Sequence, residues 1–162
     1  MQLGIFSYAL LGALAIALLI AAVTDWRRRQ IDNWLNAAIA ICAPLFWLTS
    51  GMTLVDIGFQ VALALVTFIV LAALFAAGQM GGGDVKLLTA LALWIHPLWF
   101  SRLIVIMALA GGLLTIALWV WKKWRKDGGA LAVPYGIAIS FGGLWVLADQ
   151  YIANFGQSGI SG

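Results

Sequence analysis

The chain has 162 residues, of which 64% are hydrophobic and 9% are charged, and its mean hydropathy is +1.04. These values exclude a water-soluble globular domain and indicate an all-α polytopic membrane protein, with room for about six spans of roughly 20 residues and only short loops. We attribute the net charge of +3 to Lys and Arg residues that orient the chain in the membrane, so we expect no nucleic-acid partner.

Apolar runs between charged residues predict about six membrane-spanning helices in a single domain covering residues 1–162. They cover residues 3–24, 34–50, 57–77, 86–100, 103–121 and 134–152. The first run has no basic segment before it, so we interpret it as a retained span instead of a cleaved signal peptide. The fourth run is short for a span unless it is counted from Gly82 or Gly83, which would draw Asp84 slightly into the membrane.

Positive charge follows the first, third and fifth runs. Eight of the nine Lys and Arg residues lie there: Arg27, Arg28, Arg29, Lys86, Lys122, Lys123, Arg125 and Lys126. Only Arg102 lies on the other side. Because cytoplasmic loops carry the excess of Lys and Arg, we predict that these loops are cytoplasmic and that both termini face outward.

The six acidic residues divide by predicted side. Asp25, Asp32, Asp84 and Asp127 fall on the cytoplasmic side, and Asp56 and Asp149 lie toward the outer face. We expect Asp56 to be a helix N-cap and Asp149 an interfacial acid. Asp25 and Asp84 each lie where an apolar run meets the same surface, and an ionisable residue at the edge of a span is costly enough to indicate function.

Asp84 follows Gly81-Gly82-Gly83, whose lack of side chains lets another chain approach closely. Two carboxyl groups in a partly dehydrated site tend to hold one proton between them. The ionised group could then activate water against a peptide carbonyl, while its protonated partner hydrogen-bonds the carbonyl oxygen and later protonates the leaving amine. Asp25 and Asp84 therefore predict aspartic-protease chemistry, which needs neither a metal nor a cofactor.

Three segments carry a family resemblance. The stretch Gly81-Gly82-Gly83-Asp84-Val85-Lys86-Leu87-Leu88 resembles the GxGD motif of the type IV prepilin peptidases, aspartic proteases of the bacterial inner membrane. Thr24-Asp25 with Ile31-Asp32-Asn33 resembles the segment in which an Asp closes the family's first span and Ile-Pro-Asn opens the second. Val133-Pro134-Tyr135-Gly136-Ile137-Ala138 resembles the Pro-Tyr-Gly stretch that begins its final span.

The resemblance implies that Asp25 and Asp84 cleave the leader from a prepilin or prepilin-like substrate at the cytoplasmic membrane face. Residues implied to bind substrate or shape the site are Gly81, Gly82, Gly83, Lys86, Asn33, Pro134, Tyr135 and Gly136. Asp32 stands where the family has proline, and a further catalytic role for it stays open. The chain lacks the long cysteine-bearing loop associated with zinc and N-methylation, so it resembles the short form of tight-adherence pilus systems.

Other interpretations remain open at this point. Intramembrane acids also mark ion pathways, so the chain could be a small carrier or proton relay, although its acids cluster at one face. It could also be a non-catalytic membrane subunit or, less fittingly, a signal-peptide-peptidase-like enzyme. His96 is expected at an outer turn, away from both acids, and Cys42 as a small packed hydrophobe. Membrane lipids are expected partners, and the oligomeric state is left open.

Overall fold

The computed structural model describes residues 4–125 and 133–158, with side-chain surroundings up to residue 150. These ranges hold six helices and no strand, which confirms the all-α prediction for the described part of the chain. The helices are α1 (Ile5–Arg28), α2 (Asn33–Thr49), α3 (Leu54–Ala76), α4 (Gly82–Ala92), α5 (Pro97–Arg125) and α6 (Tyr135–Ser158). Lys126 and Asp127 lie outside the described residues.

Three of these helices, α1, α3 and α5, are long and apolar enough to cross a membrane, and α2 is apolar but has only 17 residues. The prediction of a span over residues 86–100 is wrong. α4 ends at Ala92 after 11 residues, a rise of about 16 Å. That is about half of the roughly 30 Å hydrocarbon thickness of a bilayer.

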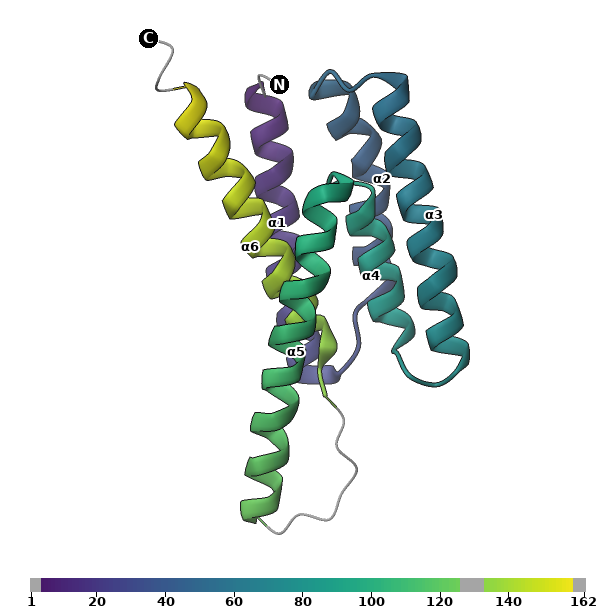
Figure 1. Cartoon of the computed structure of the whole chain (residues 1–162), viewed down its shortest axis with the longest axis vertical. Coiled ribbons are helices and arrows are strands. Elements are labelled where there is room, and N and C mark those ends of the chain that lie inside the picture. Colours follow the sequence, from purple (N-terminus) through teal and green to yellow (C-terminus); the bar gives the residue numbers. More distant parts are fainter. Residues whose placement is uncertain (1–3, 126–132, 159–162) are drawn as a thin grey trace.

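The chain leaves α4 through a turn at residues 93–96, and α5 begins at Pro97. A proline fits the first position of a helix because its missing N–H would be unpaired there in any case. Arg102, expected in a loop, consequently lies inside α5. In Figure 1 this turn lies well short of the level reached by α1, α2, α3 and α6 at that end of the bundle.

α4 forms the centre of the bundle. Six of its residues are buried, and Leu87, Leu88 and Leu91 are fully enclosed. It packs against α3, α2 and α6, while α6 also packs against α1 and α5. The apolar windows of α1, α3 and α5 are mostly exposed, which suits surfaces that face lipid.

Side chains from neighbouring helices bond the backbone where α4 ends. The indole Nε1 of Trp47 donates to the Leu93 carbonyl at 2.8 Å, and Gln60 Nε2 donates to the same oxygen at 3.4 Å. In the opposite direction, Trp94 Nε1 in the turn after α4 donates to the Ile39 carbonyl of α2 at 2.8 Å. Buried backbone groups need such partners because hydrocarbon supplies none. The short helix can therefore end inside the bundle.

The sequence predicted that Asp56 is the N-cap of α3, and this prediction is wrong. Thr53 occupies that position, and its hydroxyl oxygen accepts a bond from the Asp56 N–H at 3.2 Å. In return Asp56 Oδ2 accepts a bond from the Thr53 N–H at 3.1 Å. Asp56 is thus the third residue of a capping box, which satisfies two backbone donors at the start of the helix.

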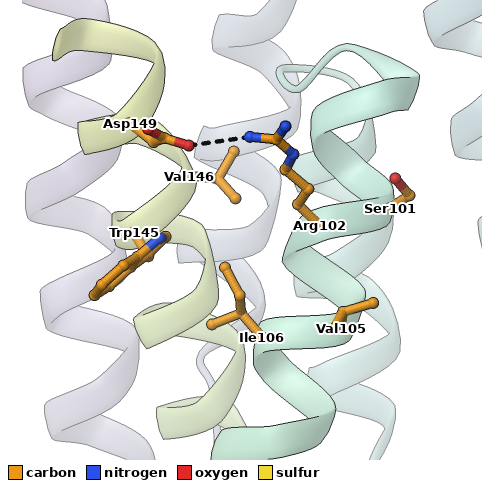
Figure 2. A pocket seen from close by; sticks show the side chains of 7 residues that line it. All are labelled: Ser101, Arg102, Val105, Ile106, Trp145, Val146 and Asp149. Atoms are coloured by element: carbon orange, nitrogen blue, oxygen red, sulfur yellow. Dashed lines mark hydrogen bonds and ion pairs between the residues drawn. The ribbon is translucent and has the colours of Figure 1, made fainter. Parts of the chain in front are cut away.

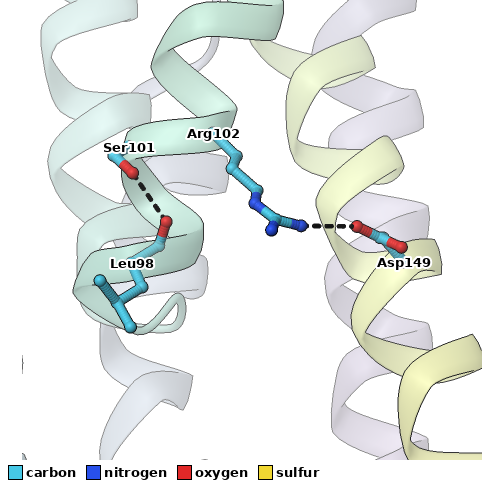
Figure 3. Close-up of polar contacts among 4 residues, drawn as sticks. All are labelled: Leu98, Ser101, Arg102 and Asp149. Atoms are coloured by element: carbon cyan, nitrogen blue, oxygen red, sulfur yellow. Dashed lines mark hydrogen bonds and ion pairs between the residues drawn. The ribbon is translucent and has the colours of Figure 1, made fainter.

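Asp149, expected as an interfacial acid, forms an ion pair with Arg102 at 3.2 Å between α6 and α5. Figure 2 shows the two side chains pointing toward each other across a cavity of about 300 Å³. The Arg102 guanidinium also stacks on Trp99 at 4.5 Å. Figure 3 shows the neighbouring Ser101 hydroxyl, which donates to the Leu98 carbonyl of its own helix at 2.7 Å.

Candidate active site

Asp25 lies in the last turn of α1 and is buried, with 5% of its surface exposed. The helix closes at Arg29, which adopts the left-handed conformation with φ 53° and donates its backbone N–H to the Asp25 carbonyl at 2.8 Å. A residue other than glycine is uncommon in this conformation. The turn brings the chain back across the end of the helix, so that Ile31 and Asp32 follow close to the Asp25 carboxyl.

Asp84 lies in the first turn of α4, where Gly81 is the N-cap and Gly82 the first helical residue. Gly83 packs against Ile31 so closely that an added Cβ would lie 3.3 Å from the Ile31 Cβ and 3.4 Å from its backbone nitrogen. At Gly81 an added Cβ would lie 3.0 Å from Asp84 Oδ2. The glycines therefore let the segment after α1 lie directly against the start of α4.

Both carboxyl groups line one polar cavity of about 410 Å³ at the end of the bundle where α1 ends and α4 begins. The other lining residues come from two segments of the chain: Arg29, Gln30, Ile31, Asp32, Asn33, Gly81, Gly82 and Gly83. The structure thus brings together residues 25 and 84, which the sequence could place only on the same face. We call this space the dyad cavity.

The Asp84 carboxyl has a strongly shifted pKa. Burial and, to a smaller extent, the nearby Asp25 carboxyl raise the pKa of Asp84 from 3.8 to about 7, and a hydrogen bond to the Gly81 backbone opposes the shift. Asp84 lies on a helix too short to span a bilayer, at the open end of the bundle. Near neutral pH it therefore holds a proton for much of the time.

The N-terminus of α6 completes the surroundings of Asp25. The backbone N–H groups of Gly136 and Ile137, in the first turn of α6, face the Asp25 carboxyl, and the charge of Arg29 also acts on it. Exposed amides at a helix N-terminus favour a negative charge. The close approach requires glycine, because a Cβ at Gly136 would lie 2.8 Å from Asp25 Cγ and Oδ2 and 2.9 Å from Ile31 Cδ1.

The remaining residues implied by the resemblance lie beside the cavity without lining it. Pro134 is buried immediately before α6, whereas Tyr135 is 41% exposed and its ring lies against Gly111 of α5. Lys86 Nζ donates to Asn33 Oδ1 at 2.8 Å. Its amine is therefore held by Asn33 and joins the start of α4 to the start of α2.

Some residues of the site were missed from the sequence. Ile31 fills the space between Gly83 and Gly136, and Asn36 Nδ2 donates to the Gly83 carbonyl at 3.4 Å. The spacing of Asn33 and Asn36 could have suggested the second contact, because residues three apart share a helix face. Asp32 occupies the N-cap position of α2 and lines the dyad cavity, and its role stays a hypothesis. No group of three or more potential His, Cys, Asp or Glu metal ligands occurs among the described residues.

A sequence profile described as the type IV leader peptidase family matches residues 12–120, which include both carboxyl groups of the cavity. The chain belongs to the type IV leader peptidase family. Membership in this family implies an aspartic peptidase. The matched residues end before Pro134, so the α6 side of the contact with Asp25 lies beyond the part of the chain that the profile describes.

A curated relative is similar to part of this chain. The preflagellin peptidase of Methanococcus maripaludis is 34% identical over 80 residues, which cover 48% of this chain and 34% of that protein. The aligned region thus spans about a third of the relative's length. No solved structure matches the chain.

Proposed function

We propose that this chain is a membrane aspartic endopeptidase that removes the leader peptide from prepilins or prepilin-like proteins, with Asp25 and Asp84 as its catalytic pair. One observation carries the proposal: the two carboxyl groups share a polar cavity at one end of an apolar bundle. Family membership supports the reaction class, and similarity to the preflagellin peptidase of Methanococcus maripaludis supports a prepilin-like substrate class.

The pair can divide the work of peptide hydrolysis. Asp84, with a pKa near 7, supplies the protonated carboxyl, which hydrogen-bonds the carbonyl oxygen of the scissile bond. Asp25, facing the first-turn amides of α6, supplies the carboxylate that takes a proton from the attacking water. As the C–N bond breaks, a proton from the pair passes to the leaving amine, so each turnover consumes one water and restores the pair.

The surroundings suit a substrate in extended conformation. A peptide bond inside a helix is shielded by its own backbone hydrogen bonds, so the segment around the scissile bond must be unwound. The glycines before Asp84 present backbone without side chains on one side of the dyad cavity, where an extended substrate can pair with it. The close packing of Gly83 on Ile31 keeps that backbone in place.

The distribution of charge supports a site at the cytoplasmic face of a bacterial inner membrane. Arg27 and Arg28 lie in the last turn of α1, at the same end as the dyad cavity, and Lys122, Lys123 and Arg125 end α5. The start of α1 and the end of α6 lie together at the opposite end of the bundle (Figure 1). The positive-inside rule then puts both termini outside.

A proton relay finds less support in the interior of the bundle. The ion pair of Arg102 and Asp149 is distant in sequence from the dyad, and apart from Asp25 the buried side chains described between the helices are uncharged. A relay needs titratable groups staged across the membrane. Within the described residues the buried carboxyl is at one end only.

Co-expression with a candidate prepilin tests the proposal. Asp25→Asn and Asp84→Asn should each lower the rate of leader removal about a thousand-fold or more, as expected for residues that act as a unit. Asp32→Asn tests the open role of Asp32, which lines the same cavity; cleavage retained within a few-fold would restrict catalysis to Asp25 and Asp84. Detergent-solubilised variants should melt like the native chain. Undiminished cleavage in either dyad variant would overturn the assignment.

A further inference from the structure

A groove of about 360 Å³ runs along α4 between α2 and α3. One end is at Asn33, which also lines the dyad cavity, and the other end is at Leu93, beyond the last turn of α4. Its walls include Ala37 and Ala40 of α2 and Ala90 of α4. Small side chains allow the backbones of two helices to approach closely in a membrane. The groove is therefore continuous with the candidate active site and shaped for an apolar helix.

A buried polar group in the groove lacks a partner. Asn36 is 4% exposed and lines the groove, and while its Nδ2 is bonded to the Gly83 carbonyl, its Oδ1 has no hydrogen-bond partner. An unsatisfied buried acceptor costs about 1–3 kcal/mol. The first four N–H groups of any helix have no partner within that helix. Asn36 Oδ1 is enclosed when the groove is empty, so a helix that starts in the groove supplies the missing donor once the Asn36 side chain turns toward it.

We propose that the groove binds the first turns of the substrate's apolar helix, on the C-terminal side of the scissile bond, with Asn36 Oδ1 accepting a bond from a backbone N–H of that helix. The proposal rests on the proposed peptidase function. A lipid acyl chain fits the apolar walls but has no donor for Asn36. Asn33 lines both the groove and the dyad cavity. A helix that starts at Asn33 therefore begins next to the dyad cavity, where the scissile bond must lie.

Kinetics with two substrates test the groove. The first substrate is a full prepilin-like precursor, and the second is the same precursor cut about six residues after the scissile bond, less than two turns of helix. Ala37→Phe fills the groove, and Ala38→Phe is the matched control, because Ala38 is also exposed on α2 but lines the crevice toward α1.

Ala37→Phe should raise KM for the full precursor about tenfold or more, equivalent to about 1.4 kcal/mol of lost binding. It should leave cleavage of the truncated substrate within about twofold, as should Ala38→Phe for both substrates. The proposal is overturned if the two variants behave alike, or if the native enzyme cleaves both substrates with equal kcat/KM. If the native enzyme cleaves neither substrate, the proposed function itself fails, and the inference with it.

Cross-linking gives a second readout that does not depend on turnover. In an Asp84→Asn, Cys42→Ser background, Ala40→Cys should form a disulfide with a single cysteine placed in the first two turns of the precursor's helix. Ala38→Cys in the same background should not. Equal cross-linking at both positions would show that the substrate helix has no preference for the groove and would overturn the proposal.

Discussion

Gly136 shows how a single missing side chain sets the position of a candidate catalytic group. An added Cβ would lie 2.8 Å from Asp25 Cγ, so either the carboxyl or the start of α6 must move. Because misplacement of a reacting group by about 1 Å can cost about 100-fold in rate, Gly136→Ala should lower kcat/KM for leader removal by that order.

Gly12→Ala is the control for this change. Gly12 also lies in a helix, α1, but a Cβ there would have no neighbour within 4 Å. The substitution should leave activity unchanged and stabilise the helix by about 0.5–1 kcal/mol. Native-like cleavage by Gly136→Ala in the same assay would show that the contact between α6 and Asp25 does not matter for the reaction.

The raised pKa of Asp84 predicts a pH dependence. An acid whose pKa is raised from 3.8 to about 7 stays protonated up to about pH 7 and loses its proton above it. Since the proposed mechanism needs Asp84 protonated, kcat/KM should fall as the pH rises from about 7 to 9, tenfold per unit once past the pKa. Thermal melting over the same range separates this loss from unfolding, and activity that rises to pH 9 would contradict the assignment of the proton to Asp84.

The residues of the site were only partly predictable from sequence. Asp25 and Asp84 are conspicuous because carboxyl groups at the edges of apolar runs are rare and costly. The contribution of α6 to the site could not be predicted from the positions of charged residues. Packing of Gly136 on Asp25 joins residues more than a hundred positions apart, and neither hydropathy nor charge encodes that contact. Only the resemblance of Pro134-Tyr135-Gly136 to a family motif pointed to it.

Among the helices, α4 depends most on its neighbours. Trp47 donates a short bond to the Leu93 carbonyl, whereas the bond from Gln60 is long and leaves Gln60 Oε1 buried without a partner. Trp47→Phe should therefore destabilise the protein by about 1–2 kcal/mol, the cost of losing a buried hydrogen bond. Gln60→Met should change stability by less than about 0.5 kcal/mol, since it removes a weak donor together with an unsatisfied acceptor.

Thermal unfolding of both variants in the same detergent would measure the difference. Activity at low temperature should persist in each, because Leu93 lies at the opposite end of α4 from Asp84. A larger loss of stability in Gln60→Met than in Trp47→Phe would contradict this prediction. It would mean that the longer hydrogen bond to the Leu93 carbonyl contributes more to stability than the shorter one.

The length of α4 could not be predicted from hydropathy because burial in protein and burial in lipid select the same residues. A helix enclosed on all sides is apolar all round, as is a membrane span. The apolar run continues from α4 through Leu93, Trp94 and Ile95 into the turn, so composition did not mark the end of the helix. The first proline after this run, Pro97, already belongs to the fifth helix and begins it.

At the scale of the whole molecule, the orientation in the membrane can be tested directly. Gln30 lies between α1 and α2, and Met52 lies between α2 and α3. In a Cys42→Ser background, Met52→Cys should react with a membrane-impermeant maleimide in intact cells, and Gln30→Cys only after the inner membrane is disrupted. The reverse pattern would place the dyad cavity outside and rule out cleavage at the cytoplasmic face.

The short central helix also has a consequence for the surrounding bilayer. The turn between α4 and α5 lies well short of the level that the neighbouring helices reach (Figure 1), so acyl chains next to it meet a shorter stretch of protein than those beside the long helices. The bilayer must thin there, or water must enter toward the paired Arg102 and Asp149. Because such mismatch costs fractions of a kcal/mol per Å, lipids with short tails relieve it and thick, sterol-rich bilayers increase it. Lipid tail length thus becomes a physical variable of this protein.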